Sequence, residues 1–221
     1  MRRALLLSVP LVLAVPIAYG VAFANAGHPP MLLPLLAGAG GWLLALVLRA
    51  PVGLVGMKLA SSPARAQRWV VASSGPLEEA ARLAALLLVG RDLGTALWIG
   101  LGWAAIEVLY AIANGFAVAA LAERTDPEAA RARAMLPPAA LTASGPLWGV
   151  VERVWASALH IGFTLVLAAV PVAVLLTAPV HTMVNIGALW LMERRGLLVV
   201  SVAGLAAGAA VMGIGWLLHV A

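Results

Sequence analysis

Cysteine is absent from this chain of 221 residues, which excludes disulfide bonds, thiolate zinc sites and a cysteine nucleophile. Charge is also scarce, because only 10% of the residues are Asp, Glu, Lys or Arg, against about a quarter in soluble domains. By contrast, 63% of the residues are hydrophobic, and the mean hydropathy is +1.03. These values are typical of a polytopic membrane protein, so we expect one integral membrane domain over residues 1–221.

Seven apolar stretches are long enough to cross a bilayer, which takes about 20 helical residues. The stretches are residues 4–24, 31–48, 69–89, 93–121, 139–170, 171–192 and 197–220. The fifth is too long for one straight span, so we expect its first turns in the interface or in a loop. The expected fold class is therefore all-α, a membrane bundle of about seven transmembrane helices.

The basic residues fall almost entirely on one side of these spans. Eleven lie before the first span or in the second, fourth and sixth loops, and only Arg91 lies on the other side. The positive-inside rule then places the N-terminus in the cytoplasm of a cell-membrane protein, and no nucleic-acid partner is needed to explain the net charge of +5. The eleven are Arg2, Arg3, Arg49, Lys58, Arg65, Arg68, Arg124, Arg131, Arg133, Arg194 and Arg195.

Three segments outside the charged spans carry further expectations. The N-terminus resembles a signal peptide, but its apolar run of about 20 residues exceeds the 7–15 of a signal core, so we expect an uncleaved helix. Residues 123–135 mix acidic and basic side chains around alanines and are expected to form a solvated cytoplasmic helix or loop. In the last span, Gly204 and Gly208 form a small-residue face that we expect to pack within the bundle.

Eight ionisable side chains fall within the predicted spans. An unpaired charge near the bilayer centre costs about 3 kcal/mol, so six would cost about 18 kcal/mol. Folds are usually stable by only roughly 5–15 kcal/mol. These side chains must therefore meet one another or water inside the bundle, which indicates a functional site. They are Glu78, Glu79, Arg82, Glu107, Glu152, Arg153, His160 and His181.

The third span carries Ser-Gly-Pro just before two adjacent carboxylates. This pattern is typical of a helix start or kink, with Ser74 as the cap and Pro76 in the first turn. Glu78 and Arg82 are four residues apart and share a helix face, so we expect them to form an ion pair. That pair leaves Glu79 without an explanation.

Each of the next three spans carries polar residues at helical spacing. Glu152 and Arg153 are equally compatible with a place near the cytoplasmic interface, and the sequence does not decide between this place and one deeper in the span. The polar residues are Trp103, Glu107, Tyr110 and Asn114 in the fourth span, Glu152, Arg153 and His160 in the fifth, and His181 and Asn185 in the sixth.

The combination of carboxylate, imidazole and amide narrows the chemistry. Neither an HExxH nor a GxSxG motif is present. A Glu with a His can deprotonate water, and a His with an Asn can stabilise an oxyanion. Alternatively, His160 and His181 with Glu107 or Glu78 form a zinc ligand set with an open fourth position, so Zn²⁺ is a possible cofactor. Both schemes are hydrolytic.

These segments resemble the superfamily of CAAX prenyl proteases and bacteriocin-processing enzymes, and most closely its YhfC-type intramembrane metalloproteases. The resemblance covers residues 73–185, about half of the chain. The matching segments are residues 78–82 (EEAAR) for EExxR, 102–107 (GWAAIE) for G-x-x-x-x-E, Glu152-Arg153 with His160 for E-R…H, and 181–185 (HTMVN) for HxxxN.

The resemblance implies roles for these residues. Glu78 and His160 would activate water, His181 and Asn185 would stabilise the oxyanion, and Glu79 and Arg82 would complete the first motif. The chain departs from the prenyl proteases, which have EExxxR and an FxxxH motif where Ala156 stands here. Glu107 is more similar to the intramembrane Glu of PrsW-type proteases.

The resulting expectation is an intramembrane endopeptidase, metallo- or glutamate-type, acting on a membrane protein or peptide within the lipid bilayer. Two alternatives use the same buried polar cluster. One is an ion-coupled transporter or channel, which places carboxylates and broken helices at the membrane midplane. The other is a catalytically inactive homologue that acts as a membrane binding protein. An inverted repeat, the signature of many transporters, is not evident.

Overall fold

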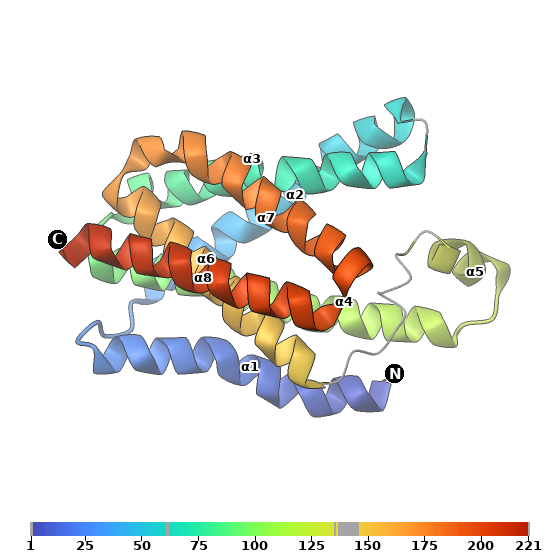
Figure 1. Ribbon diagram of the computed structural model, residues 1–221, viewed down its shortest axis with the longest axis horizontal. Coiled ribbons are helices and arrows are strands. Elements are labelled where there is room, and N and C mark those ends of the chain that lie inside the picture. Colours follow the sequence, from blue (N-terminus) through green and yellow to red (C-terminus); the bar gives the residue numbers. More distant parts are fainter. Residues whose placement is uncertain (1, 61, 135, 137–145, 221) are drawn as a thin grey trace.

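A computed structural model describes residues 2–60, 62–134, 136 and 146–220, and the elements in this part of the chain are all helical. Figure 1 shows them as a bundle of long helices with one short helix, residues 127–134, at one end. We call this end the arginine-rich end, because that helix carries Arg131 and Arg133. They are α1 (Arg2–Asn25), α2 (Leu32–Leu59), α3 (Pro63–Val89), α4 (Leu93–Glu123), α5 (Pro127–Ala134), α6 (Pro146–Ala169), the 3₁₀ turn η2 (Pro171–Ala173), α7 (Val174–Arg195) and α8 (Leu197–Val220).

Six described helices are long and apolar enough to cross a membrane, namely α1, α2, α4, α6, α7 with η2, and α8. The chain is therefore a multi-pass helical membrane protein, which confirms the expected fold class. The 27-residue α3 carries Glu78, Glu79 and Arg82 and is not among the six. It nevertheless runs alongside α2, and the two termini lie at opposite ends of the bundle (Figure 1). Seven spans with a cytoplasmic N-terminus remain a prediction.

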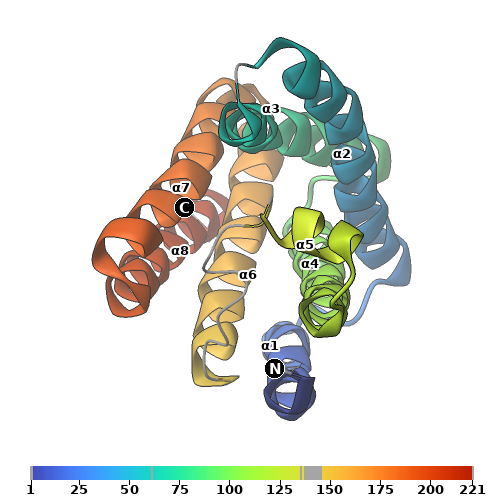
Figure 2. The same ribbon diagram turned by 90° about the vertical axis from the view of Figure 1, so that its right-hand side faces the viewer.

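Helix α6 occupies the middle of the bundle. Seen from the arginine-rich end, it lies between α4 on one side and α7 and α8 on the other, with α3 above (Figure 2). It packs against α8 and α4, whereas α7 packs mainly against α3. The glycine face of α8 lies on α6, because a Cβ on Gly204 would come within 2.5 Å of the Trp155 ring. This confirms the expectation that the face packs within the bundle.

The observed helix ends correct several predicted boundaries. The second span does not end at residue 48, because α2 continues through Pro51 to Leu59. The helix of the fifth predicted span begins at Pro146, and the predicted residues 139–145 lie outside the described part of the chain. The last span, 197–220, coincides with α8. The expected cytoplasmic segment contains the short helix α5.

The predicted helix start at Ser74 and Pro76 is wrong, because α3 is continuous from Pro63 with Ser62 as its N-cap. Proline at position 76 removes the N–H that would bond the carbonyl of Ala72. The hydroxyl of Thr182 on α7 donates to that carbonyl instead, at 3.1 Å. Gly75 permits this approach, since a Cβ there would lie 2.3 Å from the Ala178 carbonyl oxygen. The Ser-Gly-Pro segment is therefore a contact point between α3 and α7.

The half of the bundle away from the arginine-rich end has an apolar core. It is built from the last turns of α3, the first turns of α4 and the second half of α6. Leu86, Leu97 and Leu165 in this core have no exposed surface. The cluster of buried Glu, Arg and His side chains lies next to this core, on the side towards the arginine-rich end.

Candidate active site

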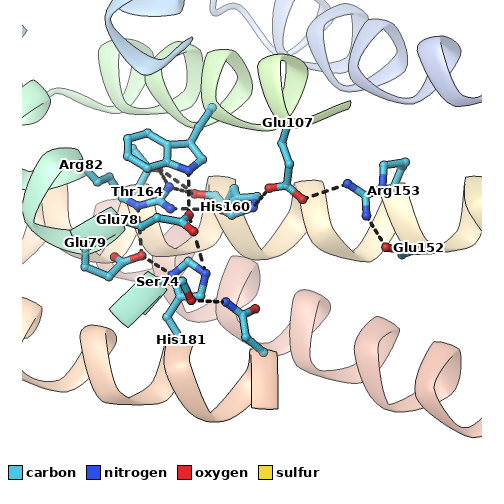
Figure 3. Close-up of polar contacts among 12 residues, drawn as sticks. Ser74, Glu78, Glu79, Arg82, Glu107, Glu152, Arg153, His160, Thr164 and His181 are labelled. Atoms are coloured by element: carbon cyan, nitrogen blue, oxygen red, sulfur yellow. Dashed lines mark hydrogen bonds and ion pairs between the residues drawn. The ribbon is translucent and has the colours of Figure 1, made fainter. Parts of the chain in front are cut away.

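Most of the ionisable residues predicted from the sequence come together at the junction of α3, α4, α6 and α7, whereas Glu152 is exposed at the edge of this group, where it contacts Arg153 (Figure 3). Glu79 and Arg82 are fully buried, and Glu78, His160 and His181 are each at most 6% exposed. Because a continuous helix keeps positions 78, 79 and 82 within one turn, α3 supplies three of these groups together. The cluster therefore depends on α6 and α7 packing against that one turn.

Three carboxylates of the cluster are each paired with a different arginine. Arg82 Nε lies 3.2 Å from Glu79 Oε1, Arg153 Nη1 lies 2.8 Å from Glu107 Oε1, and Arg49 contacts Glu78. The expected Glu78–Arg82 pair is wrong, because Arg82 turns to Glu79 one residue further on. Glu152, whose side chain is 51% exposed, also contacts Arg153, so four acids share three guanidinium groups, and these pairs neither require nor exclude a positive charge on the histidines.

Arg49 belongs to the site, although the sequence assigns it to a basic loop. It lies inside α2, and its side chain, 18% exposed, reaches Glu78 on α3. The indole N–H of Trp103 on α4 donates to the other oxygen of Glu78 at 3.1 Å. Glu78 is therefore held from α2 and α4, by two residues whose roles the sequence does not reveal.

Arg82 links α3 to α6. Its Nη1 donates to the carbonyl of His160 and to the hydroxyl of Thr164, both at 2.8 Å. Its Nη2 lies 3.1 Å from His160 Nδ1, and its guanidinium carbon lies 4.2 Å from the centre of the Trp103 ring. Arginine has donors only, so His160 Nδ1 accepts this bond. Arg82 therefore holds α3 and α6 together as well as neutralising a buried carboxylate.

The two histidines differ in whether a ring nitrogen is free. His160 Nε2 contacts Glu107, and with Nδ1 accepting from Arg82, both of its nitrogens are occupied. His181 Nδ1 lies 2.7 Å from Glu79 Oε1, so a neutral ring carries its proton there. Its Nε2 then keeps a lone pair and lies 3.8 Å from Glu78 Oε2. Among the described residues, no hydrogen-bond partner lies on this nitrogen.

A cavity of about 500 Å³ opens on this cluster. It extends along the second halves of α4 and α7 and the first turns of α6 and α8, towards the arginine-rich end. The predicted stripe residues Tyr110 and Asn114 line it, as do Asn185 and Ser74, which are joined by a 2.8 Å hydrogen bond. The predicted polar faces of the fourth and sixth spans thus border one space.

Three buried polar atoms in the described part of the chain have no hydrogen-bond partner: Arg49 Nε, Glu79 Oε2 and Thr177 Oγ1. Thr177 lies one turn before His181 on α7, and Arg49 lines the cavity. Buried polar groups normally find a partner in protein or in ordered water. Arg49 Nε, on a residue of the cavity wall, is therefore a place where water or a substrate group would bind.

The metal-capable group in the described residues is Glu78, His160 and His181, whose donor atoms lie within 4.8 Å of one another. Of the two carboxylates that the sequence offers as a third ligand, Glu78 thus joins the histidines, and Glu107 instead contacts His160 and Arg153. Two imidazoles and a carboxylate suit Zn²⁺ in kind and number. His160 would have to exchange its contact with Arg82 or Glu107 to offer a nitrogen.

The comparisons with known proteins add no assignment. No family model, no curated protein and no solved structure matches this chain. The resemblance to intramembrane proteases therefore stays a prediction carried by the motif residues.

Three residues of the site, Arg49, Trp103 and Thr164, have no predicted role in it from the sequence. For the first two, the sequence nevertheless contains a pattern that could have indicated one. Arg49 interrupts apolar residues on both sides, which indicates burial as well as topology. Trp103 shares the polar stripe of Glu107. Thr164 has no such signal, because a threonine in an apolar helix commonly bonds its own backbone, as it also does here to the His160 carbonyl at 2.7 Å.

Proposed function

We propose that the protein is an intramembrane endopeptidase that hydrolyses a peptide bond of a membrane-embedded or membrane-associated substrate. The supporting observation is the convergence of Glu78, His160 and His181, within 4.8 Å of one another, on a cavity of about 500 Å³. Carboxylates and imidazoles together provide general acid–base catalysis, and their burial in a membrane is costly without a function.

The reacting water is placed between Glu78 Oε2 and His181 Nε2. Its oxygen attacks the carbonyl carbon while His181 Nε2 takes the proton. When the C–N bond breaks, the same nitrogen returns the proton to the leaving amine. Glu79 holds the ring through Nδ1 and stabilises the imidazolium formed in between, since its carboxylate lies 2.7 Å away. Asn185, one turn along α7, offers an amide N–H to the oxyanion.

This assignment redistributes the roles that the family resemblance implies. Glu78 already accepts from Arg49 and Trp103, so it orients the water rather than taking its proton. His160 has both nitrogens occupied, so it positions Arg82 and Glu107. His181 has the free lone pair and is therefore the general base.

A bound Zn²⁺ is the competing form of the same function. Glu78, His160 and His181 would hold it, and it would supply a metal-activated water. Glu78 already accepts from Arg49 and Trp103, and both nitrogens of His160 are occupied, so a metal would have to displace these contacts. These existing contacts favour the metal-free form.

The interior of the bundle gives the cluster an approach from one end. The described cavity runs from the cluster towards the arginine-rich end, and the apolar core around Leu86, Leu97 and Leu165 fills the other half. A transporter is also open to one side in each state of alternating access, so the preference for a hydrolase rests on the carboxylate and imidazole chemistry of the cluster.

The test compares new protein N-termini in membranes from cells that carry different versions of the chain. N-termini inside or next to transmembrane segments, labelled and identified by mass spectrometry, should appear with the wild type and disappear with Glu78→Gln and His181→Gln. His219→Gln is the matched control, because His219 bonds the Leu165 carbonyl outside the cluster. Identical sets of N-termini from all four would contradict the proposal and favour an inactive binding protein.

A further inference from the structure

Trp103 stands between two charged groups that the helix spacing would otherwise bring together. It is fully buried on α4, with its indole N–H on Glu78 Oε2 at 3.1 Å and its ring face 4.2 Å from the guanidinium carbon of Arg82. Indole N–H is only a donor, and an aromatic face attracts a cation. The two surfaces of one side chain thus bind a carboxylate and a guanidinium separately.

We infer that Trp103 is a positioning residue that assigns the adjacent carboxylates of α3 to different arginines and aims Glu78 at His181. The contacts of Trp103 are independent of the proposed function, and only the expected effect on kcat rests on it. The spacing of Glu78 and Arg82 is that of a favourable i,i+4 pair. Instead, Arg82 lies on the indole face and bonds Glu79, and Glu78 is bonded by the indole edge and by Arg49.

The Trp103 ring is held in this orientation from α2. A Cβ on Gly41 would lie 2.8 Å from the ring, so α2 backs the indole closely. Trp42, Ala45 and Ala81 complete the buried cluster around it. A ring packed this way cannot swing away from Glu78 without moving α2 or α3. Its N–H therefore fixes one oxygen of Glu78, the oxygen that lies 3.8 Å from His181 Nε2.

A spectroscopic experiment tests the contact without any activity assay. The chain has eight tryptophans, so indole ¹⁵N labelling of the detergent-purified protein yields a small set of N–H resonances. Trp103→Phe identifies its own resonance, and Glu78→Ala should move that resonance upfield. The Trp98 indole, which bonds the His28 carbonyl at 3.3 Å, is the internal control and should not move. A Trp103 resonance unchanged by Glu78→Ala would overturn the inference.

The kinetic arm uses a substrate found by the N-terminus comparison. Trp103→Phe keeps an aromatic ring but loses the N–H and part of the indole surface, so kcat should fall roughly 10- to 100-fold with KM unchanged, as for a lost hydrogen bond to a charged group. Trp98→Phe makes the same change away from the site and should retain the wild-type kcat. Equal kcat for both variants would overturn the inference, whereas absence of cleavage by the wild type would contradict the proposed function alone. If Trp103→Phe does not fold, Trp→Phe variants of the other seven tryptophans assign the Trp103 resonance by elimination, and its displacement by Glu78→Ala decides.

Discussion

His160 and His181 face each other across the site, with ring centres 5.6 Å apart, yet only His181 has a nitrogen free for chemistry. His160 is bonded on both sides, by Arg82 and Glu107. His181 is bonded through Nδ1 to Glu79 and presents Nε2 towards Glu78. This difference makes the two histidines separable by mutation.

His181→Gln should abolish the reaction while leaving the fold intact, because it removes the base and can still bond Glu79. The expected fall in kcat is about 10²- to 10⁴-fold, the usual contribution of a general base. His160→Gln should lower thermal stability as well, since it disturbs the contacts of both Arg82 and Glu107. Measuring cleavage rate and melting temperature for both variants checks this; equal melting temperatures would contradict the structural role of His160.

Arg82→Met should destabilise the protein more than Arg49→Met does. Arg82 is fully buried, and its loss leaves Glu79 without a cation, which typically costs about 3–5 kcal/mol. Arg49 is 18% exposed, so Glu78 can recover some hydration from the cavity. Protein abundance and thermal unfolding in detergent rank the variants, with the exposed Arg124→Met as control. The reverse order would mean that Arg49 makes the larger contribution to stability.

Metal content separates the two forms of the proposed hydrolysis. We expect the purified protein to contain well under one zinc per chain and to retain activity after chelation, since Glu78 and His160 are already bonded to other residues of the site. Elemental analysis and activity after chelation measure both. About one zinc per chain, lost in a His160/His181 double variant, would establish the metal-dependent form.

Gly75→Ala should push α7 away from α3 and displace His181. A Cβ at this position would lie 2.3 Å from the Ala178 carbonyl oxygen and 2.8 Å from the Thr182 amide nitrogen, both on backbone that cannot turn aside. Overpacking of this kind typically costs about 1–3 kcal/mol. Gly40→Ala is the control, because nothing lies within 4 Å of a Cβ there. Equal melting temperatures for the two variants would exclude the close contact.

The start of α5 should respond to acid. A hydrogen bond from Arg124 and another from the Ala129 amide lower the pKa of Asp126 to about 2 from an ordinary 3.8. A carboxyl group with a lowered pKa stabilises its local structure above its ordinary value and loses that effect as pH falls towards 2. The Ala129 amide resonance should therefore shift between about pH 4 and pH 2, and Asp126→Asn should abolish that titration.

Local patterns in the sequence identify much of the site. Hydropathy identifies most of the spans, and the cost of charge in lipid singles out Glu78, Glu79, Arg82, Glu107, Arg153, His160 and His181, although it also selects the exposed Glu152 and misses Arg49. Helical spacing correctly places Tyr110, Asn114 and Asn185 along the cavity. These properties follow from one residue and its near neighbours on the same helix.

Contacts between helices are decided by the tertiary structure. The spacing of Glu78 and Arg82 allows a pair within α3, but Trp103 on α4 and Arg49 on α2 bind Glu78 from outside that helix. The same holds for the Ser-Gly-Pro segment, because α7 supplies the hydroxyl that lets α3 continue through Pro76. Periodicity specifies which face of a helix a residue occupies, but packing decides which residue of another helix it contacts. Here packing occupies both nitrogens of His160 and leaves Nε2 of His181 free.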